Sequence, residues 1–192
     1  MNRRIATTGA LFLAVTLAGC SRVPVEAPVA QTPSPVERGK YLVAAFGCDD
    51  CHTTKNMTAE GPVPDLSRRL AGHWEDPTLP PPPTLPPGPW GAVTTMNFTA
   101  WAGPWGISYA ANLTPEENTG IGIWTEDMFL KAMRTGKHMG QSRPILPPMP
   151  YMNYAKLNDD DLKAVFAYLK SLPPIKNQVP DPVIAPPPTA AP

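Results

Sequence analysis

The amino-acid sequence predicts an all-α fold, with three main helices joined by long proline-rich loops. Three segments, near residues 34–46, 125–136 and 158–172, each place a helix-capping residue before apolar residues at helical spacing. Proline, with 28 residues in a chain of 192, is concentrated in stretches that cannot all be helix or sheet interior. These stretches are residues 24–35, 77–89, 144–150 and 173–188. We therefore expect one packed domain that is smaller than the chain.

The first helix is expected to begin after Ser34. Ser34 and Glu37 form a capping box, and Pro35 takes the first helical position, where its missing N–H has no partner to lose. The apolar face of this helix comprises Gly39, Leu42, Val43 and Phe46. The helix then leads the chain directly into Cys48.

Two further helices are expected in the second half of the chain. Thr125 caps the first of them, which ends at Gly136. Its apolar face comprises Met128, Phe129, Ala132 and Met133. Asn158 caps the other, whose first turn carries three aspartates that complement the helix dipole, and Pro173 stops it. Its buried face comprises Leu162, Val165, Phe166 and Leu169, at the i, i+3, i+4, i+7 spacing of a core helix.

A Cys-x-x-Cys-His pattern lies directly after the first helix, at Cys48, Cys51 and His52. Two thiols three positions apart can add across the two vinyl groups of one porphyrin. The histidine that follows then lies under the iron as its proximal ligand. The pattern predicts one covalently bound haem c, attached at Cys48 and Cys51 and ligated by His52.

Three other interpretations of the pattern have less support. A thioredoxin-like redox centre needs a strand before the motif and a βαβ frame, and residues 40–60 show no such alternation. A zinc site needs a second ligand pair, but His73 and His138 are far apart in the sequence and far from any further cysteine. Two structural cysteines beside a chance histidine is the remaining alternative.

An iron that transfers electrons needs a sixth ligand that stays bound when the iron changes valence. A thioether does this and raises the reduction potential. The candidates are Met139, Met149, Met152, His73 and His138. Met149 is favoured because Pro148 and Pro150 stiffen the backbone on both sides of it. Met152 is its nearest rival.

The N-terminus has the pattern of an export signal. A basic segment, residues 2–4, precedes an apolar segment, residues 10–17, that is too short to span a bilayer. The sequence LAGC at residues 17–20 resembles a bacterial lipobox, in which Cys20 becomes the lipid-linked first residue. We therefore expect residues 1–19 to be a lipoprotein signal peptide and the protein to be lipid-anchored on the periplasmic side of a bacterial membrane. An ordinary secretory signal, which gives a soluble periplasmic protein, is the alternative.

Composition divides the rest of the chain into a tether, a domain and a tail. Residues 20–34, rich in Pro, Val and Ala, are typical of an extended tether, and residues 35–176 are expected to form the domain. Within it, we expect residues 53–110 to form a long loop with a short helical turn near residues 64–70, and this loop contains a Pro- and Trp-rich insertion at residues 72–108. Residues 177–192 have the composition of a disordered Pro- and Ala-rich tail.

The charge balance argues against nucleic acid as a partner. The chain has 16 basic and 16 acidic residues, and two of the basic ones, Arg3 and Arg4, belong to the expected signal peptide. A nucleic-acid-binding domain shows a basic stripe, and this sequence has none.

These residues resemble a class I c-type cytochrome, and the match covers roughly residues 36–175. Its motifs are the Cys-x-x-Cys-His pattern, the Met149-Pro150 pair and the helix at residues 160–169. Residues 112–122 are similar to the cytochrome subunits of periplasmic alcohol and aldehyde dehydrogenases. The resemblance implies a cytochrome c fold with three main helices around one haem, and Met149 as the distal ligand.

The resemblance also implies a crossing of the first and last helices, with Gly39 against Phe166 or Tyr168. The dehydrogenase subunits often carry two or three haem motifs, whereas this chain carries one. The chain is therefore expected to hold one haem.

The expected function is that of a monohaem electron carrier, or electron-transfer subunit, in a bacterial periplasmic respiratory chain. Its iron cycles between Fe(II) and Fe(III), and its partners are a dehydrogenase, a quinol-oxidising complex or a terminal oxidase. No nucleophile or general base stands out, so we do not expect an enzyme. A haem enzyme or gas sensor with a displaceable distal ligand is the alternative, and an interaction module that docks a partner through the insertion is a third possibility.

Overall fold

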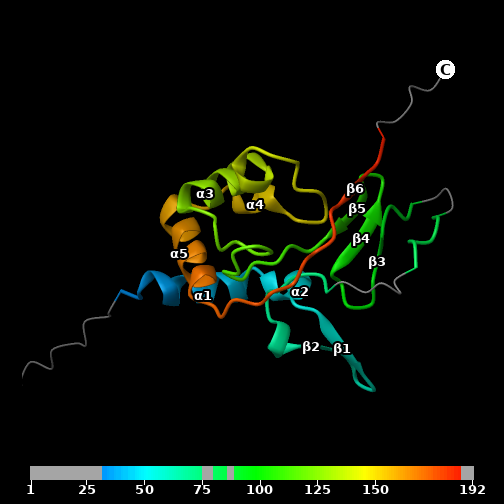
Figure 1. Ribbon diagram of the computed structural model, residues 1–192, viewed down its shortest axis with the longest axis horizontal. Helices are drawn as coiled ribbons and strands as arrows, with labels where there is room; N and C mark the ends of the chain where they lie inside the picture. Colours follow the sequence, from blue (N-terminus) through cyan, green and yellow to red (C-terminus); the bar gives the residue numbers. More distant parts are fainter. Residues whose placement is uncertain (1–31, 75–79, 86–88, 187–192) are drawn as a thin grey trace, which may run out of the picture. The chain divides into compact units, whose positions relative to one another are not determined.

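The computed structural model describes residues 32–74, 80–85 and 89–186. In this part of the chain, α-helices combine with two antiparallel sheets (Figure 1). The expectation of an all-α fold is therefore wrong. The expected signal peptide, most of the expected tether and Cys20 lie outside the described residues. Within the described ranges, no helix is long and apolar enough to cross a membrane.

The three helices that the sequence predicts are all present. They are α1 (Pro35–Ala45), α3 (Glu126–Thr135) and α5 (Asp159–Lys170), and two short helices, α2 (Cys48–His52) and α4 (Tyr151–Tyr154), lie between them. The predicted capping box at Ser34 and Glu37 forms, and Thr125 and Asn158 cap α3 and α5 through their side chains. Single 3-10 turns occur at Leu66–Arg68 and His138–Gly140.

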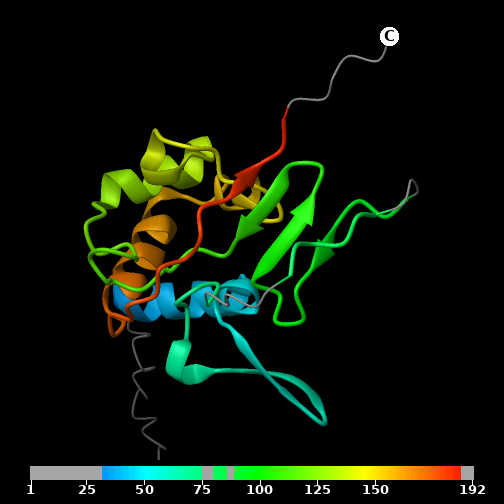
Figure 2. The same ribbon diagram turned by 45° about the vertical axis from the view of Figure 1, so that its right-hand side comes forward.

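The core lies where α1 and α3 meet α5, and Figures 1 and 2 show α1 crossing α5. Its buried members come mainly from the predicted apolar faces: Leu42, Val43, Leu70, Ile121, Phe129, Ala132, Met133, Leu162, Ala164, Val165, Phe166, Tyr168 and Leu169. A Cβ atom on Gly39 would stand 2.7 Å from the Cβ of Tyr168 and closer still to the carbonyl oxygen of Ala164. The expected crossing of the first and last helices at Gly39 and Tyr168 is thus confirmed.

Gly39→Ala is expected to lower the free energy of unfolding by about 2 kcal/mol, because the added methyl overlaps the α5 backbone and forces the helices apart. Urea unfolding of the purified protein measures the effect as a lower midpoint with an unchanged slope. Gly91→Ala is the matched control, since a Cβ at Gly91 meets no atom within 4 Å. Equal midpoints for the two variants would contradict a tight crossing.

The sheets account for the error in fold class. A hairpin forms from β1 (Lys55–Thr58) and β2 (Gly61–Pro64). A second sheet, in the order β3-β4-β5-β6, forms from β3 (Val93–Thr94), β4 (Ala100–Gly103), β5 (Gly106–Tyr109) and β6 (Val183–Ile184). These strands are two to four residues long, too short to show an alternating pattern in the sequence.

The second sheet is built from segments that the sequence predicts to be irregular. The insertion at residues 72–108 contributes β3, β4 and most of β5, so the expectation of a long loop is wrong for this part, whereas residues 80–85 and 89–92 contain no helix or strand. The fourth strand, β6, lies in the stretch where the sequence predicts a tail, and it pairs with β5 at Gly106 and Ile107. Figure 2 shows this C-terminal strand beside β5.

Candidate haem site

The two cysteines of the motif lie on one turn of α2. Gly47 precedes this helix with φ +64°, a left-handed conformation that allows the sharp turn from α1 into α2. Cys48 and Cys51, at positions i and i+3, share one face of the helix, and both are half-buried free thiols. Burial raises the pKa of Cys48 to about 11, and it raises the pKa of Cys51 as well. The structure therefore presents two protonated thiols, unpaired with each other, at the spacing that one porphyrin requires.

His52 closes the same helix and is held by the backbone. Its side chain is only 8% exposed, and its Nδ1 lies 2.7 Å from the carbonyl oxygen of Ala111. A carbonyl only accepts, so Nδ1 carries the proton and Nε2 keeps its lone pair, as in a metal-ligating histidine. Burial lowers the pKa of His52, which favours the neutral ring.

The segment around Ala111 is itself anchored next to the motif. The N–H of Gly72 donates to the His52 carbonyl at 2.8 Å, and the N–H of His73 donates to the Ala110 carbonyl at 2.8 Å. Gly72 has φ +83°, and a Cβ there would overlap the backbone of Ala110 and Ala111. Three chain segments therefore pack at backbone contact around the imidazole.

An ion pair that the sequence does not reveal ties the motif to the C-terminal helix. Arg69 donates to both carboxylate oxygens of Asp49, at 2.9 and 2.6 Å, and to the Tyr168 hydroxyl at 2.6 Å. The Asp49 side chain and the Tyr168 hydroxyl raise the pKa of Arg69. Bidentate pairs of this kind fix orientation as well as distance. The first variable residue of the Cys-x-x-Cys pattern thereby orients α2 against α5.

Met149 is the candidate distal ligand whose surroundings suit the role. It is half-buried and packs against the hydrophobic core cluster, as Cys48 does. Met152, its rival in the sequence, is 66% exposed. Met139 lies in the 3-10 turn His138–Gly140 with φ +53°. The burial of Met149 favours it over Met152, but it does not test a bond to iron. The role of Met149 as the distal ligand therefore stays a prediction.

The two histidines considered as alternatives have other contacts. The Nδ1 of His73 lies 2.8 Å from the Thr99 hydroxyl, and its ring packs on Tyr109 with centroids 4.9 Å apart. His138 is half-buried and meets the edge of Trp124, with centroids 5.0 Å apart.

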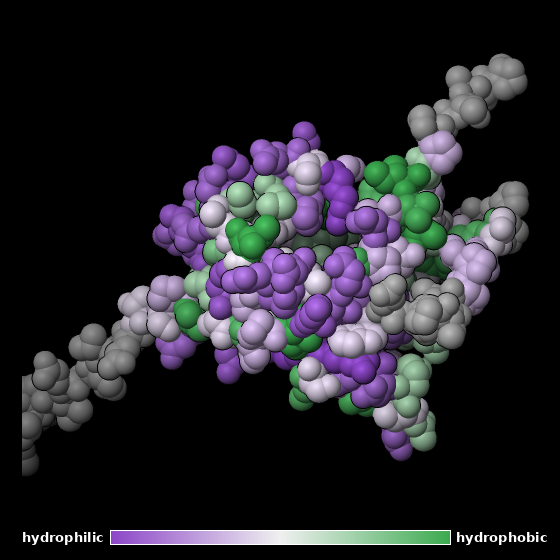
Figure 3. Space-filling view, viewed as in Figure 1, coloured by the Kyte–Doolittle hydropathy of each residue, from purple (hydrophilic) through white to green (hydrophobic). Residues whose placement is uncertain are grey.

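Tyr154, at the end of α4, contacts Phe46, which lies just before the helix that carries Cys48 and Cys51. Its hydroxyl donates to the Phe46 carbonyl at 3.3 Å, and the two rings pack with centroids 5.5 Å apart. Burial and the nearby thiols of Cys48 and Cys51 raise the pKa of Tyr154 to about 12. Helix α4, which begins two residues after Met149, therefore contacts the residue that ends α1, two positions before Cys48. Figure 3 shows a hollow on this face of the molecule, between α4 and α2.

The residues in this region fit a haem c. Cys48 and Cys51 would hold the vinyl-derived side chains, and His52 would offer Nε2 to the iron. The hydrophobic core against which Cys48 packs also carries other partly buried residues: Phe46, Leu113, Trp124, Leu130, Ile145, Met149, Tyr154, Leu157 and Leu172. No cluster of three or more His, Cys, Asp or Glu side chains in the described ranges could hold a metal ion instead.

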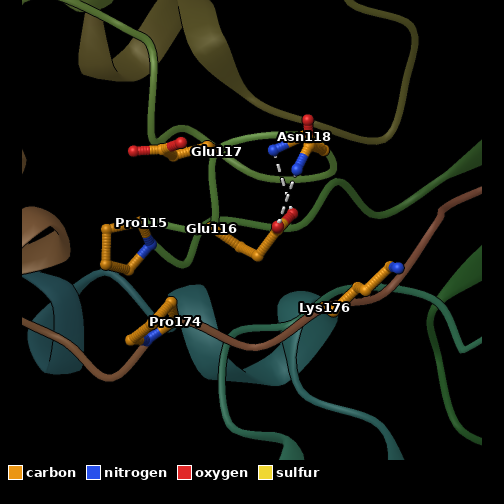
Figure 4. Close-up of a pocket in the computed structure, with 6 residues that line it drawn as sticks. All are labelled: Pro115, Glu116, Glu117, Asn118, Pro174 and Lys176. Carbon is orange, nitrogen blue, oxygen red and sulfur yellow. Dashed lines mark hydrogen bonds between the residues drawn. The ribbon is translucent and has the colours of Figure 1, made fainter.

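A surface pocket of about 390 Å³ lies apart from these residues, and Figure 4 shows its lining. It is lined by Pro115, Glu116, Glu117, Asn118, Pro174 and Lys176. The carboxylate of Glu116 accepts hydrogen bonds from the backbone N–H groups of Asn118 and Thr119, at 3.1 and 2.6 Å, so it stabilises its own turn. None of the predicted site residues lines this pocket.

Comparison with known proteins gives relatives that include the cytochrome subunits of several bacterial dehydrogenases, although no family model matches the chain. A gluconate 2-dehydrogenase cytochrome c subunit of Pantoea cypripedii is 32% identical over 69% of this chain and 22% of its own length. A fructose dehydrogenase cytochrome subunit of Gluconobacter japonicus is 30% identical over 92% of this chain and 30% of its own length. A quinone-dependent alcohol dehydrogenase cytochrome c subunit of Gluconobacter oxydans is 37% identical over 41% of this chain and 17% of its own length.

The matched stretch spans less than a third of each of these relatives. All three are cytochrome subunits by name, and the dehydrogenases that they belong to act on different substrates. The chain is similar to the cytochrome c subunits of bacterial dehydrogenases, and the resemblance to c-type cytochromes drawn from its motifs is confirmed.

Proposed function

We propose that this chain is an electron-transfer cytochrome that carries one haem c. The observation that carries the proposal is His52: a buried imidazole whose Nδ1 donates to a carbonyl lies directly after two free thiols on one helical turn. When bound, the haem supplies an Fe(II)/Fe(III) couple. Cys48 and Cys51 would hold it in place, and His52 and Met149 would offer their Nε2 and Sδ atoms to its iron.

The role of the protein in this proposal is to keep the site rigid and dry. The Ala111 carbonyl orients the ring of His52, and the Asp49–Arg69 pair orients the helix that carries it. The apolar residues around Met149 and Tyr154 exclude water, so that few groups need to rearrange when the iron changes charge. Small rearrangement favours fast electron transfer.

We propose a dehydrogenase as the redox partner, within a bacterial periplasmic respiratory chain. The names of the relatives support this choice, since they are cytochrome subunits of gluconate, fructose and alcohol dehydrogenases. The ferric protein should then be reduced by a purified dehydrogenase of this group together with its substrate. If the ferric protein were reduced no faster with the substrate of the dehydrogenase than without it, that dehydrogenase would be excluded as a partner.

The absorption spectrum of the purified holoprotein, ferric and ferrous, with and without carbon monoxide, tests the proposed function. We expect a low-spin spectrum with the weak far-red band of methionine sulfur on ferric iron, unchanged by the gas. We also expect a measurement of iron content to give one iron atom per chain. A high-spin or readily gas-bound haem would favour an enzyme or sensor over an electron carrier.

Anchoring through Cys20 is proposed from the sequence alone, because Cys20 lies outside the described residues. Cys20→Ala is expected to move the protein from the membrane fraction to the soluble periplasmic fraction, since the lipid attachment point is lost. Fractionation after a salt wash, followed by haem staining, measures the change. Ser21→Ala is the matched control and should stay with the membrane. Retention of Cys20→Ala in the washed membranes would contradict the lipid anchor.

A further inference from the structure

One extended segment contacts the chain on both sides of the candidate haem site. Strand β5 runs into Ala110 and Ala111, and the Ala111 carbonyl accepts the hydrogen bond from His52. Three residues earlier, the hydroxyl of Ser108 donates to the carbonyl oxygen of Pro147 at 2.5 Å. Pro147 lies two residues before Met149. Figures 1 and 2 show the loop between α3 and α4, which contains Met149, reaching this strand.

The Met149 segment has few ways to be held by its own backbone. Pro147, Pro148 and Pro150 have no N–H, so in residues 147–150 only Met149 could donate a backbone hydrogen bond. The segment must therefore be fixed mainly through its carbonyl oxygens. The Met149 and Pro150 carbonyls accept from the N–H groups of Tyr151 and Asn153 in the adjoining helix α4, each at 2.9 Å. From a distant part of the chain, the Ser108 hydroxyl donates to the carbonyl of Pro147 in this segment.

Ser108 is itself well fixed. It is only 9% exposed, and it pairs with Trp101 of β4 in the antiparallel register. The Trp101 carbonyl lies 3.5 Å from its hydroxyl oxygen, too far to compete with Pro147. A buried hydroxyl on a paired strand loses little conformational freedom when it donates, so the bond to Pro147 is a strong positional constraint.

We propose that Ser108 is a positioning residue that holds residues 147–150 so that Met149 stays on the haem iron. The inference rests on the proposed function, because it takes Met149 as the distal ligand. One segment, residues 108–111, then fixes both axial ligands, His52 through Ala111 and Met149 through Pro147. The second sheet thereby connects the two sides of the site.

The affinity of the ferric holoprotein for imidazole, an added ligand that must displace Met149, tests the proposal. Ser108→Ala removes the hydroxyl and is expected to raise that affinity about five-fold, the factor that corresponds to one hydrogen bond of ordinary net strength. Ser108→Thr keeps the hydroxyl and should restore the affinity of the unmodified protein. Ser171→Ala is the matched control, since the Ser171 hydroxyl also donates to a carbonyl, that of Tyr168, at 2.7 Å.

A second pair of variants covers the case in which Ser108→Ala yields no holoprotein. Valine and threonine have the same shape and both favour strands, so Ser108→Val and Ser108→Thr differ only in the hydroxyl. The valine variant is expected to bind imidazole about five-fold more tightly than the threonine variant. A general loss of stability would instead lower the urea midpoint of both and leave their imidazole affinities equal.

The outcomes separate this inference from the proposed function. If the unmodified protein shows the methionine far-red band, and variants with and without the hydroxyl bind imidazole equally, then Ser108 does not position Met149, although the electron-transfer proposal stands. If the unmodified protein lacks the far-red band, Met149 is not the ligand and the positioning role fails, whereas the electron-transfer proposal fails only if the haem is high-spin or readily binds carbon monoxide. Tighter imidazole binding only where the hydroxyl is missing supports the positioning role.

Discussion

Met149→Ala is expected to leave the haem attached and to open the iron to carbon monoxide. Cys48, Cys51 and His52 are untouched in this variant, so covalent attachment persists. A methionine that occupies the iron for about 99% of the time lowers the apparent affinity of the iron for an added ligand about 100-fold. Removing the methionine should therefore raise the apparent affinity for carbon monoxide about 100-fold. A carbon monoxide titration of the ferrous protein, followed in the Soret region, measures the change.

Met152→Ala is the control for this experiment. The Met152 side chain is 66% exposed, and Met152 lies only three residues from Met149. The variant therefore tests whether the thioether of a neighbouring methionine can be the sixth ligand of the iron. We expect its spectrum and its indifference to the gas to match the unmodified protein. If Met149→Ala failed to bind carbon monoxide while Met152→Ala bound it, the sixth ligand would be Met152. If neither bound it, a histidine would hold that position.

His52→Ala is expected to abolish stable holoprotein, and Cys51→Ala should do the same. The His52 ring is buried and hydrogen-bonded to Ala111, so its loss costs about 3 kcal/mol even before the bond to iron is counted. The haem, held from this side, also fills the space against which the apolar residues pack. Haem staining after denaturing electrophoresis, with protein detected in parallel, measures the loss.

The histidine control is His138→Ala. His138 is half-buried beside Trp124, and it follows no pair of cysteines, so we expect normal haem staining from this variant. Normal staining of His52→Ala or Cys51→Ala would contradict the assignment of the attachment site. Loss of staining in all three variants would mean that the protein tolerates no large change near its core, and urea unfolding of His138→Ala would then show the same loss of stability.

The attachment motif and the main helices are readable from the sequence because they are local. One helical turn brings Cys48, Cys51 and His52 together, and the three caps lie within three residues of the groups that they bind. The apolar spacing of α1, α3 and α5 identifies the faces that the core uses. The crossing at Gly39 was implied by the resemblance to c-type cytochromes, and the structure shows it.

The contacts that orient the site could not be read in this way. The His52 imidazole is oriented by the carbonyl of Ala111, 59 residues away, and a backbone carbonyl has no signature in the sequence. Arg69 reaches Asp49 across 20 residues and Tyr168 across 99, so nothing local distinguishes this arginine from one on the surface. Such pairs form only when packing brings the segments together.

The sheet separates what the sequence determined from what tertiary structure decided. The sequence alone determined the Cys-x-x-Cys-His pattern and the three helices, because spacing, capping and apolar periodicity act within a few residues. Tertiary structure alone decided that the Pro- and Trp-rich insertion forms strands, that β6 joins them from the far end of the chain, and that Ser108 meets Pro147. Strands of two to four residues gain their stability from partners distant in the chain rather than from their own pattern.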